Sequence, residues 1–404
     1  MTSPGDGPFS AADSALGYLY QTRVALLWSL RRMKSRPDFS VSLETLDDVV
    51  FESTGADPAE LLQTKHHLTR AAALSDASPD LWKSLRVWLE GSRTGAIAPD
   101  ATLYLLSTSE APDGSIASRL RPDPRDVETA LSTMAAISAS SSSTTNAPAY
   151  VAFKKTSLRD RQRLVERIFV LDNCPNILDL DDALMAEVFW TVDRGQHDAF
   201  LRRLEGWWTR RVIRQLADPT SNGILAAEIE AEMTDLRDQF KPDSLPIDDD
   251  LLAFNPDEHT LRDHAQTTFV RQLEIIQASR ARIAWAIRDY YRAFQQRSRW
   301  IREDLVLVGD LEKYERRLIE EWQLQFEAVR NELGEAAAED AKRTAARQVL
   351  RWAESVSIPI RPAVAEPFVC RGSLHMLADA ARIGWHPEFE DRLAALISAG
   401  EVQS

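Results

Sequence analysis

Three side chains in the N-terminal part of the chain have the chemistry needed to hydrolyse a phosphodiester: Asp48, Gln63 and Lys65. A carboxylate such as Asp48 can hold Mg²⁺ (or Mn²⁺), and Mg²⁺ takes few protein ligands and keeps several waters. The amide of Gln63 can provide a second ligand or hold a metal-bound water. The ammonium of Lys65 can orient the attacking water or stabilise negative charge in the transition state. These residue types indicate a metal-dependent hydrolase.

The segment from Val41 to His67 is predicted to be a β-hairpin that brings these groups together. Its first arm, Val41–Glu52, is rich in Val, Leu and Phe and carries the acidic pair. A turn is expected at 53–58, which contains Gly, Asp and Pro, and the second arm covers 61–65. Because side chains alternate along a strand, Gln63 and Lys65 share one face of this arm.

A purely structural interpretation of the same residues stays open. An acidic pair before a Val-rich strand is often a solvated strand end, and a Q-x-K string is short. His66 and His67 are interpreted as polar strand-end residues rather than ligands. Glu44 and Asp47 are second-rank candidates for the site.

The strings GYLYQ, ETLDDVVFE and LLQTKHH follow one another in an order that resembles the PD-(D/E)xK nuclease superfamily in its Q-x-K variant. The closer similarity is to the double-stranded DNA endonuclease domain of bacterial antiphage effectors. This resemblance implies an α/β, restriction-endonuclease-like core and an Mg-dependent deoxyribonuclease. It places Gln21, the third second-rank residue, near the metal, where related nucleases carry Glu; a surface amide is the alternative. Gln63 replaces the usual acid, so Glu44, Asp47 or Glu52 would have to compensate.

The charge of the chain sets a condition on DNA binding. The net charge is −14, and residues 1–148 contain 13 basic and 18 acidic residues. Since phosphate contacts supply most non-specific DNA affinity, this composition argues against a constitutive DNA-binding protein. We therefore expect a partner or oligomerisation to complete the surface that holds double-stranded DNA.

Length and composition predict two domains. We expect an endonuclease domain at 1–136, a Ser/Thr-rich linker at 137–149 and a helical partner-binding or oligomerisation domain at 150–404. Met1–Phe9 is expected to be a disordered tail. Helices are predicted at Ala11–Met33, Pro79–Glu90, His264–Phe294, Arg299–Glu332 and Ala337–Ser355, and strands at Thr102–Ser107 and Ile168–Leu171.

Cysteine usage and hydropathy predict a cytoplasmic protein that does not enter a membrane. Cys174 and Cys370 are far apart in sequence and are expected to be free thiols. The N-terminus has no apolar leader, and no apolar run has bilayer length.

The C-terminal part carries two features of its own. The segment Arg280–Arg302 interleaves arginines with aromatic residues, a pattern that can track nucleic acid, although a core with paired arginines is the favoured interpretation. Trp207 and Trp208 are interpreted as core or interface anchors.

The strings LEGWWTRR, DYYRAFQQRSRW and RGSLHMLADAARIGWHP resemble the C-terminal region of nuclease effectors of Lamassu and the related ABC-three-component systems. That resemblance implies an SMC-like ABC ATPase and a small third subunit as partners, and a nuclease that forms a homo-oligomer on activation. Two other classes stay open: a catalytically inactive assembly subunit of such a complex, and a helical scaffold whose N-terminal sheet is incidental.

Overall fold

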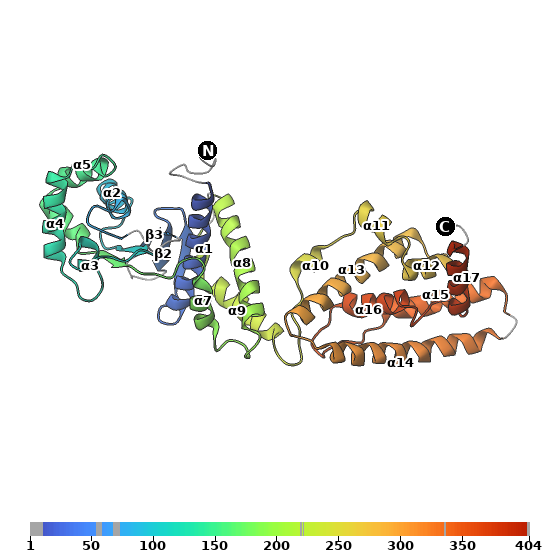
Figure 1. Cartoon of the computed structure of the whole chain (residues 1–404). Coiled ribbons are helices and arrows are strands. Elements are labelled where there is room, and N and C mark those ends of the chain that lie inside the picture. The colour runs from blue at the N-terminus through green and yellow to red at the C-terminus, as the bar shows by residue number, and fades with distance from the viewer. Residues whose placement is uncertain are drawn as a thin grey trace. The chain divides into compact units, whose positions relative to one another are not determined.

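The computed structural model describes residues 11–53, 59–67, 73–218, 220, 222–334 and 337–401. The expected tail at 1–9 lies outside these residues, as do positions 54–58 of the expected turn. The chain divides into two compact units (Figure 1). The first comprises Met1–Val192 and Phe200–Asp235, and the second comprises Asp193–Ala199 and Leu236–Ser404.

The first unit is a mixed α/β structure built on a six-stranded sheet with the order β5-β4-β3-β2-β1-β6. The strands β1, β2 and β3 form an antiparallel meander, β4 and β5 extend it in parallel, and β6 pairs antiparallel with β1. Their bounds are Phe39–Leu43, Val49–Ser53, Glu60–Lys65, Thr102–Ser107, Ile168–Leu171 and Ile224–Leu225.

Two helices of this unit position the candidate site. They are α1 (Ala11–Met33), which precedes the sheet, and α2 (Pro79–Thr94), which connects β3 to its parallel neighbour β4. The remaining helices are α3 (Ile116–Arg119), α4 (Val127–Ser140), α5 (Ala147–Lys155), α6 (Leu158–Val165), α7 (Leu180–Val188), α8 (His197–Ala217) and α9 (Ala226–Gln239). The structure confirms the predicted bounds of α1, β4 and β5.

The predicted hairpin is wrong in its first arm. Val41–Glu52 is not one strand: β1 ends at Leu43, the chain turns, and β2 begins at Val49. Glu44 opens this turn with a φ of 52°, a conformation that ends a strand. Asp47 and Asp48 therefore lie in the β1–β2 turn, directly before β2. The sheet contains two more strands than the sequence suggested, because the first arm is divided in two and β6 was not predicted.

The predicted linker and domain boundary are also wrong. Residues 137–149 belong to the end of α4 and the start of α5, where the Asn146 side chain is buried and donates to Ala77 O at 2.9 Å. Beyond it, Tyr150 and Phe153 pack against Trp82 of α2. The polar segment thus makes structural hydrogen bonds, and the α/β unit continues far past residue 150.

The second unit is helical, as predicted. It contains α10 (Asp249–Ala253), α11 (Glu258–His264), α12 (Thr268–Ile275), α13 (Arg280–Arg302), α14 (Val308–Leu333), α15 (Glu339–Ser355), α16 (Pro367–Asp379) and α17 (Phe389–Glu401). The expected helix His264–Phe294 is interrupted, because Gln277 adopts a φ of 53° between α12 and α13. Asp304, with a φ of 55°, separates α13 from α14.

Helices α13 and α16 approach each other closely at Gly372. A Cβ atom at this position would lie 2.0 Å from the backbone oxygen of Asp289 and 2.5 Å from the Cβ of Ala293. Beside this contact, Arg371 donates to the buried carboxylate of Asp289 at 2.7 Å. Only glycine permits this crossing, so the two helices are fixed in register there.

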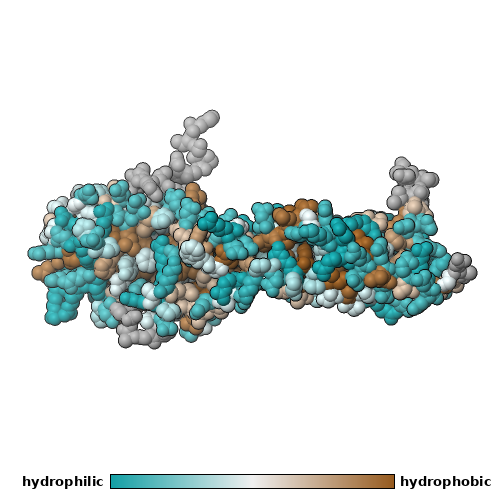
Figure 2. Space-filling view, turned by 90° about the horizontal axis from the view of Figure 1, so that it is seen from below, coloured by the Kyte–Doolittle hydropathy of each residue, from teal (hydrophilic) through white to brown (hydrophobic). Residues whose placement is uncertain are grey.

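Hydrophilic residues cover most of the surface shown in Figure 2, and hydrophobic residues form smaller patches between them. Among the helices of the described residues, none combines the length and the apolar character that a bilayer span requires.

Candidate functional site

The strand β3 presents alternate side chains to α1 and to α2. On one side, Leu61 shares a hydrophobic core with Trp88 of α2, and His67, just past the strand, bonds to Asp80 of the same helix. On the other side, the ring of His66 lies 4.6 Å from that of Tyr20 in α1. Because Gln63 and Lys65 have the same parity as Leu61 and His67, we place them on the α2 side of the sheet.

Asp48 closes the open end of the β2–β3 pairing. The register of these strands ends with Val49 opposite Leu62. Beyond that pair, Oδ2 of Asp48 accepts hydrogen bonds from the backbone N of Thr64 at 2.7 Å and from its Oγ1 at 2.9 Å. The carboxylate is thus fixed beside the residue that lies between Gln63 and Lys65. Among the described residues, no hydrogen bond engages Oδ1 of Asp48.

Asp47 is the most strongly perturbed acid of this cluster. Its side chain is 9% exposed; Oδ2 accepts from Nε1 of Trp88 at 2.7 Å, and Oδ1 accepts from the backbone N of Asp48 at 3.1 Å. The pKa of Asp47 is raised to about 6, mainly by burial and also by the charge of the neighbouring Asp48, while these hydrogen bonds and the charge of Lys65 oppose the shift. A buried acid between a carboxylate and an ammonium is typical of functional sites.

Gln63 and Lys65 carry polar groups with no direct partner among the described residues. The Gln63 side chain is 7% exposed, and no hydrogen bond joins its amide to any residue that the structure describes. Within the same ranges, no carboxylate forms an ion pair with Lys65, although its charge acts on the pKa values of Asp47, His67 and Asp80. The amide is not among the fully buried polar groups that lack a partner, so it keeps some contact with solvent and is available for a ligand.

Asp80 and His67 form a pair that sequence reasoning missed. Nε2 of His67 lies 2.7 Å from Oδ2 of Asp80, in the first turn of α2. This hydrogen bond raises the pKa of His67. Burial raises the pKa of Asp80, but the hydrogen bond and the charges of His67 and Lys65 together bring it below its ordinary value. No sequence signal joins the two residues, because Asp80 belongs to α2 and meets His67 only through tertiary packing.

The second-rank residues lie at the edge of this arrangement. Gln21 is 4% exposed, which excludes the surface amide, and its Nε2 donates to the backbone oxygen of Asp48. The backbone N of Glu44 donates to the same oxygen at 3.1 Å, but the side chain of Glu44 is exposed. Burial raises the pKa of Tyr18, and the negative charge of Glu44 adds to that shift. Gln21 therefore supports the acidic turn, and Glu44 shapes it through its backbone.

The donor set fits a divalent ion that prefers oxygen. Asp48 has a carboxylate oxygen without a partner among the described residues, and Gln63 has an amide without one. The charges of Asp48 and Lys65 both act on Asp47. Carboxylate and amide oxygens are the protein ligands of Mg²⁺.

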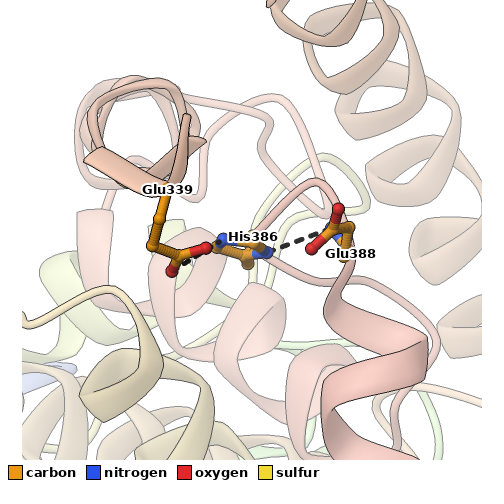
Figure 3. A group of neighbouring side chains, drawn as sticks. All are labelled: Glu339, His386 and Glu388. Atoms are coloured by element: carbon orange, nitrogen blue, oxygen red, sulfur yellow. Dashed lines mark hydrogen bonds and ion pairs between the residues drawn. The ribbon is translucent and has the colours of Figure 1, made fainter. Parts of the chain in front are cut away.

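A second group of ligand-type side chains lies in the second unit and comprises Glu339, His386 and Glu388 (Figure 3). Its carboxylates are already paired: Arg392 donates to both, at 2.5 to 3.1 Å, and Lys342 pairs with Glu388. Nδ1 of His386 accepts from the backbone N of Glu388 at 3.1 Å, so a neutral ring carries its proton on Nε2. That nitrogen then has no lone pair for a metal. We assign this group as an ion-pair network between α15 and α17.

Part of the second unit is similar to a known protein family. Residues 269–393 match a family model described as C-terminal domain 7 of the ABC-three component (ABC-3C) systems. We call residues 269–393 the ABC-3C domain, because they are similar to this family model. No curated protein matches the chain.

The ABC-3C domain runs from α12 into α17 and contains two of the three C-terminal strings. DYYRAFQQRSRW and RGSLHMLADAARIGWHP predicted a similarity to ABC-three-component systems, and the match confirms it. The third string, LEGWWTRR, lies outside residues 269–393. The first string lies on α13 and the second begins on α16, so the crossing at Gly372 joins them.

The segment Arg280–Arg302, which interleaves arginines with aromatic residues, mostly agrees with the interpretation that it forms a core with paired arginines. Arg282, Arg297 and Arg299 pair with Glu354, Glu315 and Asp250. The expected core is only partly correct, because Ile287 is buried while Trp285 is 57% exposed and Phe294 is 45% exposed. In the first unit, Trp208 is buried and donates to Thr22 O at 2.8 Å, as expected of a core anchor.

Proposed function

We propose that the first unit is a metal-dependent double-stranded DNA endonuclease and that the chain is the effector of an ABC-three component antiphage or antiplasmid defence complex. One observation carries the first part: Asp47 and Asp48 meet the end of β3 where Gln63 and Lys65 lie, and Lys65 acts electrostatically on Asp47. The helix–strands–helix–strand order of the unit is compatible with the α/β nuclease core implied by the sequence.

Each residue then has a role in phosphodiester hydrolysis. Asp48 and Gln63 hold the Mg²⁺ or Mn²⁺ ion, with Asp47 as the additional acid that compensates for the Gln. A bound ion supplies Lewis-acid polarisation of the phosphodiester. Lys65, without a carboxylate partner among the described residues, stabilises negative charge on the phosphate or orients the attacking water.

His67 is proposed as a positioning residue in this reaction. Asp80 fixes its ring on the α2 side of the sheet, next to Lys65. There it can bind a phosphate oxygen and keep the scissile group against Lys65.

The partners follow from the ABC-3C domain and from the charge of the chain. An SMC-like ABC ATPase and a small third subunit are the proposed partners, and the ABC-3C domain is the surface that binds them. With a net charge of −14, the isolated chain should hold DNA weakly. A homo-oligomer formed on activation would place two or more sites on one duplex and so strengthen binding.

The test uses the full chain with and without its ATPase partner, on linear double-stranded DNA, with Mg²⁺ or Mn²⁺. Cleavage that EDTA stops, together with loss of cleavage in a Lys65→Ala variant, supports the nuclease. Absence of cleavage in the presence of partner, ATP and foreign DNA ends contradicts it.

One observation favours the rival function, a catalytically inactive assembly subunit. Three of the four carboxylate oxygens of Asp47 and Asp48 already accept hydrogen bonds within the fold. If these acids only hold the β1–β2 turn, D48N should lower stability without changing any activity of the assembled complex.

A further inference from the structure

The ABC-3C domain contains a cavity of about 470 Å³ whose charge is opposite to that of the whole chain. Its wall is formed by the first three turns of α14, the segment that precedes this helix and the segment that follows α15. The lining residues are Val306, Asp310, Lys313, Tyr314, Arg317, Ile360 and Arg361. Three of these side chains are cationic and one is acidic, in a protein with a net charge of −14.

The cations of this cavity are poorly neutralised by the protein. Lys313 lies 3.7 Å from Asp310, which is a long ion pair. Within the described ranges, no carboxylate forms an ion pair with Arg317 or with Arg361. Arg361 is half-buried, and its two terminal nitrogens donate to Ser244 O at 2.9 Å and Leu305 O at 2.6 Å. A guanidinium held in place by carbonyls, with no carboxylate partner among the described residues, is prepared for an anionic ligand.

The rest of the wall is apolar and rigid. Tyr314 is buried, and its hydroxyl donates to Ile358 O at 2.8 Å, which fixes the ring. Val306 and Ile360 complete this side. A cavity of this size with one cationic side and one apolar side suits a small amphiphilic anion rather than an inorganic ion.

We propose that this cavity binds a nucleoside phosphate. The phosphates contact Lys313, Arg317 and Arg361, and the base and sugar pack against Val306, Tyr314 and Ile360. The concave shape favours a small molecule over the backbone of a duplex, which requires an extended cationic surface. This inference is independent of the proposed nuclease, because the cavity lies entirely in the second unit.

The experiment is calorimetric titration of the full chain at fixed ionic strength. The probes are ATP, ADP, AMP, adenosine, tripolyphosphate and a short DNA duplex. At least one of the three nucleotides should bind, and at least tenfold more tightly than adenosine and tripolyphosphate. Equal binding of tripolyphosphate would overturn the proposal by reducing the cavity to an inorganic-anion site. Equal binding of adenosine, preferential binding of the duplex, or no binding of any nucleotide would also overturn it.

Charge-reversal variants of the exposed cations in the cavity wall test whether the nucleotide binds in this cavity. K313E and R317E should each weaken nucleotide binding at least tenfold without lowering the thermal stability of the free protein, since both side chains point to solvent. R330E is the matched control: Arg330 lies on the same helix, is exposed and does not line the cavity. The affinity of R330E for the nucleotide should stay within twofold of that of the unaltered chain. An equal loss in R330E would place binding elsewhere and contradict the proposal.

Discussion

The indole nitrogen of Trp88 donates a 2.7 Å hydrogen bond to Oδ2 of Asp47, and this contact ties α2 to the turn that carries both candidate acids. Trp88 is itself buried in the core beneath the sheet. The hydrogen bond therefore fixes the carboxylate of Asp47 against a rigid element. It also keeps that carboxylate on the side of β3 where Lys65 lies, so the fold supplies an organised acid-amine pair.

The raised pKa of Asp47 predicts a pH-dependent stability. A folded-state pKa of about 6, against 3.8 for the free residue, means that the folded protein favours the protonated acid. This contribution is complete below the unfolded-state pKa and is lost as the pH rises through about 6. Between pH 4 and pH 8, D47N should therefore gain stability relative to the unaltered chain, by about 2–3 kcal/mol. Urea unfolding of both proteins at several pH values measures the difference, and parallel pH profiles would contradict it.

Lys65 should be essential for cleavage and dispensable for folding. Because no carboxylate among the described residues pairs with its ammonium, K65A removes charge stabilisation from the reaction but no ion pair from the fold. We expect cleavage of linear DNA to fall by about 10²-fold or more, with an unchanged melting temperature. K155A is the control, since Lys155 is an exposed lysine of α5. Full activity in K65A, or an equal loss in K155A, would remove Lys65 from the site.

The neighbouring histidines should have separable effects. His67 faces α2 and bonds to Asp80, while His66 packs against Tyr20 and accepts from the backbone N of Ile177 at 3.3 Å. We expect H67A to lower cleavage about tenfold to a hundredfold, mainly through KM, and H66A to lower stability instead. The double variant H67A/D80N should be little worse than either single variant, because the two residues act as a unit. Additive losses would show that they act separately.

Sequence reasoning succeeded where an element has a strong local signal. The apolar run TLYLLS predicts β4, and the apolar stripe of 11–33 predicts α1. It failed where a backbone reversal is made by a residue that does not favour it. Glu44, Gln277 and Asp304 all adopt positive φ, which Glu and Gln rarely do and Asp does only in a minority of cases. Each of them was therefore placed inside a longer predicted element.

Only those residues of the candidate site that lie close together in the sequence could be predicted. Asp48, Gln63 and Lys65 were found by residue type and spacing, and the structure fixes the first of them beside Thr64, between the other two. Trp88 and Asp80 could not be predicted, since they reach the site from α2 through tertiary packing. The linker was misplaced for a similar reason: a Ser/Thr-rich composition does not show that Asn146 is buried in hydrogen bonds.

The crossing of α13 and α16 makes the stability of the ABC-3C domain sensitive to a single methyl group. In G372A the new Cβ would lie 2.0 Å from the backbone oxygen of Asp289, and no flexible side chain can move to relieve that clash. We expect the second unit to lose about 3 kcal/mol or more, seen as a lower melting temperature and earlier urea unfolding. G309A is the matched control, because Gly309 lies on α14 with no atom of the described residues within 4 Å of a new Cβ. That variant should be neutral or slightly stabilising, as expected for alanine in a helix. Equal melting temperatures of G372A and G309A would mean that α13 and α16 can move apart without a loss of stability, and this outcome would contradict the close packing at Gly372.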